Sequence, residues 1–572
     1  MSERGILVRS WIVAGLLLLS FCGLGVKLAY LHLSNHSKMV GRVFTRELVA
    51  LRGGIFDRNG KRYPMAMSLP ASLFFVDPKT VKKEHDIRNI ARTVSEQLGL
   101  PEADVLEKLQ RTDSSYIKLG YSFDERVIAA LTTNTISGIG VEEIVLRRYP
   151  QGRRMSHVLG FVNTAGIGGA GIEQQYNRYL AGTPGVIKGV STGEKKPKEI
   201  YSHRKMLVPP IAGSDLFLTL DHNIQYEVER ALQEVVEKYE ALSGWVIVQQ
   251  VKTGAILAMA SYPDFDPENY RESTADVWRN NALAVVYEPG SIMKAVTVSS
   301  LLNERLATPD TLFDVGEGVW FYAGKPLRDH VYGRIPVSTA LKKSSNIACA
   351  KMGLELGNHR LEAYLRGFHF GEKLGLELPG EERGILARRK DWDKLTPTRV
   401  PIGQGIAVTG LQMINAYSTI ANDGVMMKPY IVDRIVSPDG ETIFKAKPEV
   451  LGRPVRAEVA RSVREMLVGV TEDGGTGKRA FVPGYSVAGK TGTAQKAVPG
   501  GYSNTDYYAS FVGFVPAGEP VFSVLVSVDR PRPQHTGGFV SAPVFAKIAA
   551  ATARYLEIPP DLPSEETEVA GR

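Results

Sequence analysis

One apolar segment near the N-terminus constrains this chain more than any other feature of its sequence. The segment runs from Trp11 to Leu33 (WIVAGLLLLSFCGLGVKLAYLHL), with Lys27 and His32 as its basic residues and no acidic residue. A helix of about 20 apolar residues is long enough to cross the hydrocarbon core of a bilayer. We therefore expect a transmembrane anchor at residues 11–33, preceded by a cytoplasmic tail of residues 1–10.

The flanks of this segment decide between an anchor and a cleaved signal peptide. No small-residue cleavage site of the A-x-A type follows the apolar run, which favours an uncleaved anchor. Arg4 and Arg9 precede it, and the positive-inside bias keeps this short N-terminus in the cytoplasm. The rest of the chain then lies on the other side of the membrane. Cys22 is in the anchor and Cys349 is alone outside it, so an intrachain disulfide is excluded.

The overall charge does not indicate a nucleic-acid partner. The 572 residues carry a formal net charge of +8, but the 69 basic residues are mixed with 61 acidic ones. No zinc-ligand, RNA-recognition or helix-turn-helix pattern is present. The densest basic run, from Gly193 to Lys205, is interpreted as a solvated linker, with attraction to anionic lipid or polymer phosphate as the alternative.

Turn signals divide the part beyond the anchor into two regions. Asn59-Gly60, between apolar flanks, is a strong hairpin signal. The stretch from Gly171 to Gly185 predicts a helix that Gly182 ends. The pair Pro209-Pro210 marks a boundary. The expected units after the anchor are an α+β domain over 45–205, a second domain over 212–557 and a disordered tail over 558–572.

The second region has the pattern of an antiparallel sheet flanked by helices. A strand leads to a helix with Asp221 as its N-cap, and two apolar strands then flank the turn Lys252-Thr253-Gly254. Three later strand candidates, YSVAGKTGTAQ, YYASFVGFV and PVFSVLVSVD, have short polar connections without room for crossover helices. Such connections indicate an antiparallel meander. Thr409 and Gln412 form a capping box for a further helix, which Asn422 to Gly424 end.

A serine and a lysine lie three positions apart in the apolar stretch VVYEPGSIMKAVTVSSLL. Pro289-Gly290 cannot continue a helix, so we expect a helix that starts at Ser291 and is buried on every face. Ser291 and Lys294 then share one face of the first turn, within reach of each other. Burial disfavours the ammonium form, so the Lys294 amine can act as a base that activates Ser291 as a nucleophile. A snorkelling surface lysine is the alternative interpretation of this pair alone.

Two downstream motifs complete a known combination. KKSSNIACAK contains Ser344, Ser345 and Asn346, and VAGKTGTAQ contains Lys490-Thr491-Gly492 followed by Thr493. The order S-x-x-K, S-x-N, K-T-G is the signature of penicillin-binding proteins and class A β-lactamases. RGGIFDRNG, GIEQQYNRYLAGTPG and GQGIAVTGLQMINAYSTIANDG also occur in family order. The sequence therefore resembles the class B penicillin-binding proteins, which are membrane-anchored peptidoglycan D,D-transpeptidases.

The resemblance implies an α+β multidomain fold and a role for each motif residue. An elongated pedestal of the dimerisation type would follow the anchor, and a penicillin-binding, β-lactamase-like transpeptidase domain would come last. Ser291 would be the acylating nucleophile, Lys294 its general base and Ser344 the proton relay toward the leaving amine. The backbone N–H groups of Ser291 and Thr493 would form the oxyanion hole. The substrate-binding residues would be Asn346, Lys490, Thr491, Gly492 and Thr493.

Three further expectations concern these motifs. Lys490 would hold a substrate carboxylate and lower the pKa of Lys294 through the proximity of two like charges. Gly492, inside a strand, allows close approach of another backbone, which a substrate peptide added alongside the strand would use. Ser345 fills the variable middle position of its motif and is assigned no role. The earlier Lys252-Thr253-Gly254 is interpreted as a structural hairpin tip.

The implied reaction needs no metal or organic cofactor. Ser291 would attack the penultimate D-Ala of a stem pentapeptide, expel the terminal D-Ala and pass the peptide to the amine of a neighbouring stem. β-Lactams would trap Ser291 as an acyl-enzyme. GQGIAVTGLQMINAYS and VAGKTGTAQK resemble the cell-division (septal) branch more than the elongation branch. The alternatives are an elongation- or spore-type transpeptidase of the same class, or a catalytically silent β-lactam-binding scaffold or sensor.

Location and partners are also implied by the resemblance. The protein would be a single-pass protein of the bacterial cytoplasmic membrane, with its catalytic domain in the periplasm or extracytoplasmic space. Its partners would be peptidoglycan stem peptides, β-lactams as covalent inhibitors, and the membrane lipid around residues 11–33. A polytopic lipid II glycosyltransferase and other division proteins are the expected protein partners, and nucleic acid is not expected.

Overall fold

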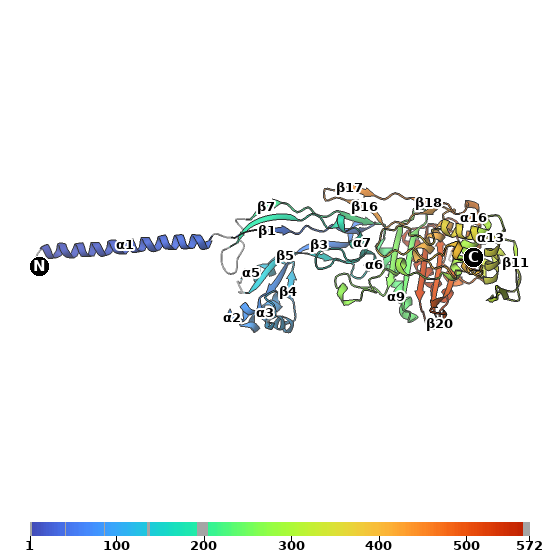
Figure 1. The fold of residues 1–572 in the computed structure, drawn as a ribbon, viewed down its shortest axis with the longest axis horizontal. Coiled ribbons are helices and arrows are strands. Elements are labelled where there is room, and N and C mark those ends of the chain that lie inside the picture. The colour runs from blue at the N-terminus through green and yellow to red at the C-terminus, as the bar shows by residue number, and fades with distance from the viewer. Residues whose placement is uncertain are drawn as a thin grey trace, which may run out of the picture. The chain divides into compact units, whose positions relative to one another are not determined.

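The computed structural model describes residues 3–39, 42–84, 86–111, 113–133, 138–191 and 204–563. They form two compact units, between which the chain passes several times (Figure 1). The first unit comprises Met1–Leu51, Pro70–Val145 and Gly182–Gly213. The second unit comprises Arg52–Leu69, Leu146–Ala181 and Ser214–Arg572. Two segments that precede Pro209 in sequence therefore pack with the C-terminal part of the chain.

The first unit begins with the long helix α1 (Glu3–Met39). Its segment Trp11–Tyr30 is exposed along its whole length and is long and apolar enough to cross a membrane. Three antiparallel strands follow in the order β1 (Arg42–Leu48), β6 (Gly185–Ser191) and β7 (Lys205–Val208). Most of the basic run expected to be a linker lies outside the described residues.

A second part of the first unit is a small α+β layer. The C-terminal half of β3 (Gly60–Val76) pairs with β4 (Ile117–Ser122), and β5 (Ile139–Arg148) also pairs with β3. The buried side chains of Phe74, Val94 and Leu119 contribute to one apolar cluster. The helices of this layer are α2 (Pro78–Glu84), α3 (Ile87–Leu98), α4 (Glu102–Gln110) and α5 (Glu125–Thr133).

A mixed sheet in the second unit joins segments that are far apart in sequence. Asn59 lies in the turn between β2 (Ile55–Asp57) and β3, and Gly60 has φ +92°, which confirms the predicted hairpin. The strand order continues from β3 through β2 to β8 (Asp215–Leu218), β16 (Val432–Val436) and β17 (Thr442–Lys445). The parallel pairing of β2 with β8 connects the Asn59 hairpin to the start of the C-terminal region.

The central sheet of the second unit is antiparallel, with the strand order β10-β9-β21-β20-β19. Its three C-terminal strands, drawn in orange to red in Figure 1, are consecutive neighbours, which confirms the predicted meander. The hairpin of β9 and β10 adds to the meander through β21. The strands are β9 (Ser243–Gln250), β10 (Ile256–Tyr262), β19 (Ala488–Val498), β20 (Gly501–Val515) and β21 (Phe522–Asp529).

Both faces of this sheet are covered by helices. Alternate residues of β9 point to opposite faces, as strand geometry requires. Trp245 and Ile247 belong to one apolar cluster with residues of α11, α13 and α15, whereas Val246 and Val248 belong to another with residues of α9 and α18. The expected fold class, an antiparallel sheet flanked by helices, is therefore confirmed. The covering helices are α9 (His222–Lys238), α11 (Lys294–Asn303), α13 (Asn346–Gly367), α15 (Gly410–Ala421) and α18 (Ala542–Tyr555).

Shorter elements complete the second unit. The strands are β11 (Leu312–Gly316), β12 (Val319–Tyr322), β13 (Lys325–Arg328), β14 (Gly333–Pro336), β15 (Met426–Met427) and β18 (Val450–Gly452). The α-helices are α6 (Ser156–Leu159), α10 (Asn281–Ala284), α12 (Val337–Lys342), α14 (Thr396–Arg399), α16 (Ala457–Thr471) and α17 (Gly537–Val540). The 3₁₀ turns are η2 (Tyr270–Glu272), η3 (Gly290–Met293), η4 (Arg389–Asp391), η5 (Val400–Ile402) and η6 (Lys478–Ala480).

Local capping signals were reliable predictors of helix ends. The Asp221 carboxylate accepts from the backbone N–H groups of Asn223 and Ile224, as expected of the N-cap of α9. The predicted capping box of Thr409 and Gln412 is present at the start of α15, which ends at Ala421. These positions are confirmed because a cap depends on residues within one turn of it.

Two expectations about segment ends were wrong. The helix predicted between Gly171 and Gly182 is split into α7 (Gly171–Gln175) and α8 (Asn177–Leu180), because Tyr176 leaves the helical conformation. Residues 558–562, expected in a disordered tail, are held in place: the Ile558 carbonyl accepts from the Tyr485 hydroxyl at 2.6 Å, and Asp561 accepts from Ser486. Residues 564–572 lie outside the described residues.

Candidate active site

Ser291 lies on a 3₁₀ turn rather than in an α-helix. The turn η3 contains Ser291, and α11 begins at Lys294. The sequence predicted a helix starting at Ser291, and the tighter first turn is a form that is common at helix N-termini. Every residue from Lys294 to Leu302 is buried, which confirms that the helix is enclosed on all sides, while Ser291 itself is half-buried.

The Lys294 amine points at the S-x-N motif. Its Nζ atom is 2.6 Å from the Ser344 carbonyl oxygen, 2.8 Å from Asn346 Oδ1 and 3.1 Å from Ser344 Oγ. The side chain is fully buried, and burial lowers the pKa of Lys294, with Cys349 and Asp329 acting in the opposite direction. Among the hydrogen bonds of the described residues, none joins this amine to Ser291. The snorkelling interpretation of Lys294 is therefore wrong.

The motif residues Ser344, Ser345 and Asn346 form a strained turn at the start of α13. Ser344 has φ +60°, a left-handed conformation that costs a non-glycine residue about 1 kcal/mol. Ser345 is the N-cap of α13, and its Oγ accepts from the backbone N–H of Ala348 at 3.1 Å. The Asn346 side chain accepts from Lys294 through Oδ1 and donates to the Arg328 carbonyl through Nδ2 at 3.2 Å. The hydrogen bonds of Ser345 and Asn346 therefore hold the strained turn in place.

A buried carboxylate that the sequence reasoning missed fixes this turn. Asp329 Oδ2 accepts from Ser345 Oγ at 2.5 Å and from the backbone N–H of Ile347 at 2.9 Å. Its Oδ1 accepts from the His330 backbone N–H at 2.8 Å, and the side chain is wholly covered. Ser345, which had been assigned no role, therefore connects the motif to Asp329. No local pattern in the sequence links these two residues, because they are 16 positions apart across β14 and α12.

The K-T-G motif lies on β19, which pairs with β20 and is the last strand of the central sheet among the described residues. Lys490 is fully buried, and its Nζ atom makes long contacts of 3.3 and 3.4 Å to Thr491. Burial and the positive charge of Lys294 lower the pKa of Lys490 well below its ordinary value. The resemblance implied that Lys490 would lower the pKa of Lys294. The structure shows the reverse, because it is the charge of Lys294 that lowers the pKa of Lys490.

The two threonines of this motif have partners of their own. Thr491 is nearly covered, and its hydroxyl is 2.7 Å from that of Thr476. The Thr493 hydroxyl accepts from the backbone N–H of Gly537 at 3.2 Å and is half-buried. Thr493 is thus the more accessible of the two residues.

A side chain at Gly492 would be crowded by the packing inside the protein. A Cβ atom at this position would lie 3.0 Å from Ile292 Cγ2 and 3.2 Å from the Pro289 carbonyl oxygen. The close neighbours of this position are therefore the turn η3 and the preceding Pro289. The approach of a substrate peptide along the strand edge stays a prediction. A Cβ at Gly290 would in turn lie 3.2 Å from the Thr493 carbonyl oxygen, so the segments that carry the two expected oxyanion-hole N–H groups are neighbours.

Two further residues hold the nucleophile segment and were not found from the sequence. The Tyr417 hydroxyl, buried on α15, donates to the Ile292 carbonyl at 2.8 Å. Glu288, three residues before Ser291, accepts from the backbone N–H of Gly405 at 2.8 Å and from the Tyr502 hydroxyl at 3.2 Å through the same oxygen. Both contacts cross long stretches of sequence, so no local signal could have indicated them.

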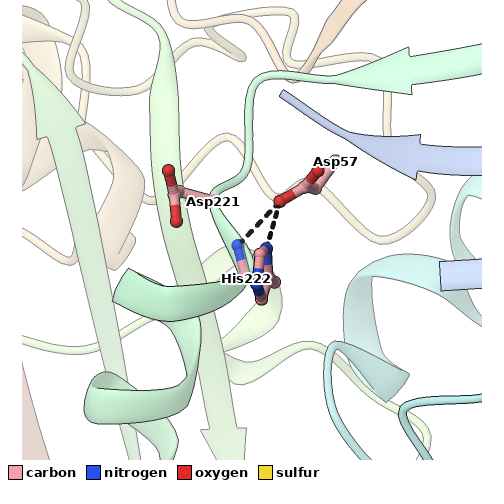
Figure 2. Close-up of side chains that lie close together, drawn as sticks. All are labelled: Asp57, Asp221 and His222. Atoms are coloured by element: carbon pink, nitrogen blue, oxygen red, sulfur yellow. Dashed lines mark hydrogen bonds and ion pairs between the residues drawn. The ribbon is translucent and has the colours of Figure 1, made fainter. Parts of the chain in front are cut away.

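Asp57, Asp221 and His222 form a separate cluster in the second unit, close enough together to be tested as a metal site. Figure 2 shows Asp57 Oδ2 accepting from both the His222 backbone N–H at 3.2 Å and its Nδ1 at 2.5 Å. Asn59 donates to both oxygens of Asp57, and Asp221 caps α9. These oxygens already accept hydrogen bonds from N–H donors, so the cluster fits a structural junction between the Asn59 hairpin and α9 better than a cation site.

Comparison with known protein families places both regions of the chain. Residues 244–550 match the penicillin-binding protein transpeptidase domain, and residues 47–218 match the penicillin-binding protein dimerisation domain. The probable peptidoglycan D,D-transpeptidase PenA of Neisseria meningitidis is 31% identical over 530 residues, which is 91% of this chain and 87% of PenA. Stage V sporulation protein D of Bacillus subtilis is 32% identical, over 89% of this chain and 79% of that protein.

A solved structure agrees with these sequence matches. Penicillin-binding protein 3 of Mycobacterium tuberculosis, in complex with aztreonam, matches with a TM-score of 0.70 and 28% identity. The match covers 91% of this chain and 99% of that structure. The similarity therefore includes the region before Pro209 as well as the C-terminal domain.

Proposed function

The chain belongs to the class B penicillin-binding proteins, and we propose that its active site catalyses peptidoglycan D,D-transpeptidation through an acyl-Ser291 intermediate. The observation that carries this function is the buried amine of Lys294, 3.1 Å from Ser344 Oγ and three residues after Ser291. A lysine with a pKa lowered by burial can be neutral when the substrate arrives, and a neutral amine is a base.

Each step of acylation has a residue to perform it. Ser291 Oγ attacks the carbonyl carbon of the penultimate D-Ala while its proton passes to the Lys294 amine. The negative charge on the carbonyl oxygen is stabilised by the backbone N–H groups of Ser291 and Thr493. Ser344 Oγ then relays the proton to the leaving amine of the terminal D-Ala. In the second half of the reaction, the amine of a neighbouring stem attacks the acyl carbonyl carbon and forms the new amide. The bond from this carbon to Ser291 Oγ breaks, and the proton lost by the amine returns to Ser291 Oγ.

The substrate binds along the free edge of β19. Main-chain hydrogen bonds to an edge strand hold an extended peptide, and neighbouring side chains select it. Lys490 and the hydroxyls of Thr491 and Thr493 bind the terminal carboxylate of the donor. Gly492 lets the strand pack against η3. The Asn346 amide orients the backbone of the donor peptide. β-Lactams use the same site, because they mimic the D-Ala-D-Ala end and acylate Ser291.

A cross-linking assay tests this function directly. The full chain in detergent is incubated with uncross-linked glycan strands that carry pentapeptide stems, and released D-Ala and cross-linked dimers are measured. Ser291→Ala should produce neither. Ser300→Ala is the matched control, because its hydroxyl donates to the Val296 carbonyl within the same helix. Appreciable cross-linking by Ser291→Ala would refute the assignment, and a wild type that binds penicillin without cross-linking would favour the scaffold or sensor alternative.

The septal role and the membrane topology are parts of the same proposal. The sequences of the motifs that contain Gln412 and Lys490 support a septal enzyme, and a spore- or elongation-type role is the alternative. The apolar segment Trp11–Tyr30 supports a single-pass anchor with its N-terminus in the cytoplasm and the catalytic domain outside. A fluorescent fusion at the division site, and protease access to the second unit in spheroplasts, test these two points. A polytopic lipid II glycosyltransferase and other division proteins remain the proposed partners.

A further inference from the structure

The last strand of the mixed sheet in the second unit, β17, is exposed along its whole length. It pairs with β16, and no other strand of the described residues pairs with it. Its residues include two exposed apolar side chains, Ile443 at 50% and Phe444 at 44%. Neighbouring residues of a strand point to opposite faces, so both faces of β17 are open to solvent. An edge strand of this kind presents free backbone N–H and C=O groups to another chain.

A cavity of about 300 Å³ lies beside this strand. Phe444 of β17 lines it, together with Leu376, Tyr430 and Ile431 from other segments of the second unit. Pockets that hold ligand groups in proteins start at about this size, and apolar and aromatic side chains form most of their walls. The described residues that line the cavity include no motif residue of the active site. An apolar side chain of another molecule can therefore enter the cavity without touching those motifs.

Lysines outnumber carboxylates around this cavity. The charged residues that line it are Lys428, Lys445, Lys447, Glu377 and Glu449. Lys428 pairs with Glu449 at 3.1 Å, and Glu377 accepts from the Tyr176 hydroxyl at 2.8 Å. The other two lysines are exposed and make no ion pair with any carboxylate in the described part of the chain. Lysines on an edge strand hinder pairing with an uncharged apolar strand, but they attract a strand that carries carboxylates.

We propose that β17 and this cavity form a binding site for an extended, acidic segment of a partner protein, which adds to the mixed sheet as its next strand. Main-chain hydrogen bonds to the edge of β17 supply affinity, and the side chains of the segment supply specificity. An apolar side chain of the segment fills the cavity beside Phe444. Carboxylates on neighbouring residues of the segment pair with Lys445 and Lys447. This site is separate from the catalytic motifs, so the inference does not depend on the proposed function.

Short labelled peptides test this inference on the full-length protein in detergent. The probe is a fluorescein-labelled peptide of alternating glutamate and valine residues, and its matched control has lysine in place of glutamate. Two further versions of the probe carry N-methyl groups on one or the other set of alternate backbone amides, because successive N–H groups of a strand point to its two opposite edges. Fluorescence anisotropy measures binding to the wild type, to the double variant Lys445→Glu/Lys447→Glu and to Lys325→Glu. Lys325 is the control position, since it is an exposed lysine of β13 in a different sheet. Labelling by a fluorescent penicillin shows that each variant is folded.

The acidic peptide should bind the wild type about tenfold or more tightly than the lysine peptide, because its charges complement the unpaired lysines. The double variant should reverse this preference, Lys325→Glu should keep it, and only one of the two N-methylation patterns should abolish binding. No binding of the acidic peptide, equal binding of the two peptides, or tolerance of both N-methylation patterns would overturn the inference. Dimers of the wild type in analytical ultracentrifugation that the double variant does not form would also overturn it, because β17 would then pair with a second copy of the chain.

Discussion

Replacing Asp329 by Asn separates the charge of this residue from its shape. The carboxylate accepts from Ser345 Oγ at 2.5 Å and from the Ile347 backbone N–H at 2.9 Å, and it is wholly covered. An amide of the same size keeps one acceptor oxygen and loses the charge. Hydrogen bonds to charged groups contribute about 1.5–3 kcal/mol each, so we expect Asp329→Asn to lower the free energy of unfolding by about 2–3 kcal/mol.

The same substitution should slow acylation. Ser344 has φ +60° and is held in that conformation by its neighbours, so a looser Ser345 lets Ser344 and Asn346 move away from the Lys294 amine. A displacement on the order of 1 Å in a catalytic group costs about a hundredfold in rate. We expect the second-order rate of penicillin acylation, followed by stopped-flow fluorescence, to fall between about tenfold and a hundredfold.

The pH profile distinguishes an electrostatic effect from a purely structural one. Asp329 raises the pKa of Lys294, while burial, the larger effect, lowers it. Removal of the negative charge should therefore lower the pKa further and move the acid limb of the acylation profile to lower pH, even though the maximal rate falls. The other groups coupled to Lys294 are Cys349 on α13 and Lys490 on β19, and neither is changed.

A matched carboxylate controls for the loss of a charge near α13. Asp314 accepts from the Gly316 backbone N–H at 2.8 Å, and its carbonyl contacts Lys351 of α13, but it touches no motif residue. Asp314→Asn should leave both the acylation rate and its pH limb unchanged. Wild-type acylation with an unmoved acid limb in Asp329→Asn would refute the role assigned to this residue.

Three further outcomes follow from the same geometry. In the wild type, the rate of penicillin acylation should rise with pH along a limb below the ordinary lysine pKa of 10.5, because burial lowers the pKa of Lys294, and a limb at or above 10.5 would contradict the general-base role. Gly492→Ala should slow acylation by about tenfold and lower the free energy of unfolding in urea by about 1–3 kcal/mol, because the added Cβ would contact η3 too closely. Gly518→Ala is the control and should change neither quantity, since nothing lies within 4 Å of its added Cβ. Burial raises the pKa of Glu229 to about 7 from 4.5, so its stabilising contribution is present below pH 4.5 and lost as the pH rises through 7. Glu229→Gln should reduce the change in the free energy of unfolding over this pH range by up to about 3 kcal/mol. A variant whose unfolding free energy depends on pH as in the wild type would contradict this role of Glu229.

The sequence was most informative where structure depends on near neighbours. The Asn59 hairpin, the caps at Asp221 and Thr409 and the antiparallel meander were predicted correctly, because turn chemistry and loop length determine them locally. Lys252-Thr253-Gly254 does form a hairpin turn, with φ +82° at Gly254. The buried helix after Ser291 was predicted for the same reason, although its first turn is 3₁₀.

The features that the sequence did not reveal depend on contacts across long separations. Asp329 acts on Ser345 through the folded loop, and Tyr417 reaches Ile292 over 125 positions. The close packing of η3 against Gly492 also joins segments that are far apart in the sequence. Segments 52–69 and 146–181 pack with the C-terminal part of the chain because their partners, such as β8, come later in the sequence.

Labelling of the purified full-length protein by a fluorescent penicillin, with the modified peptide mapped by mass spectrometry, identifies the nucleophile. We expect a stable label on Ser291 that persists for many minutes, and none on Ser291→Ala. A label on any other residue, or equal labelling of Ser291→Ala, would contradict the assignment of Ser291 as the nucleophile. Absence of a label on a folded wild type would contradict acyl-enzyme formation itself.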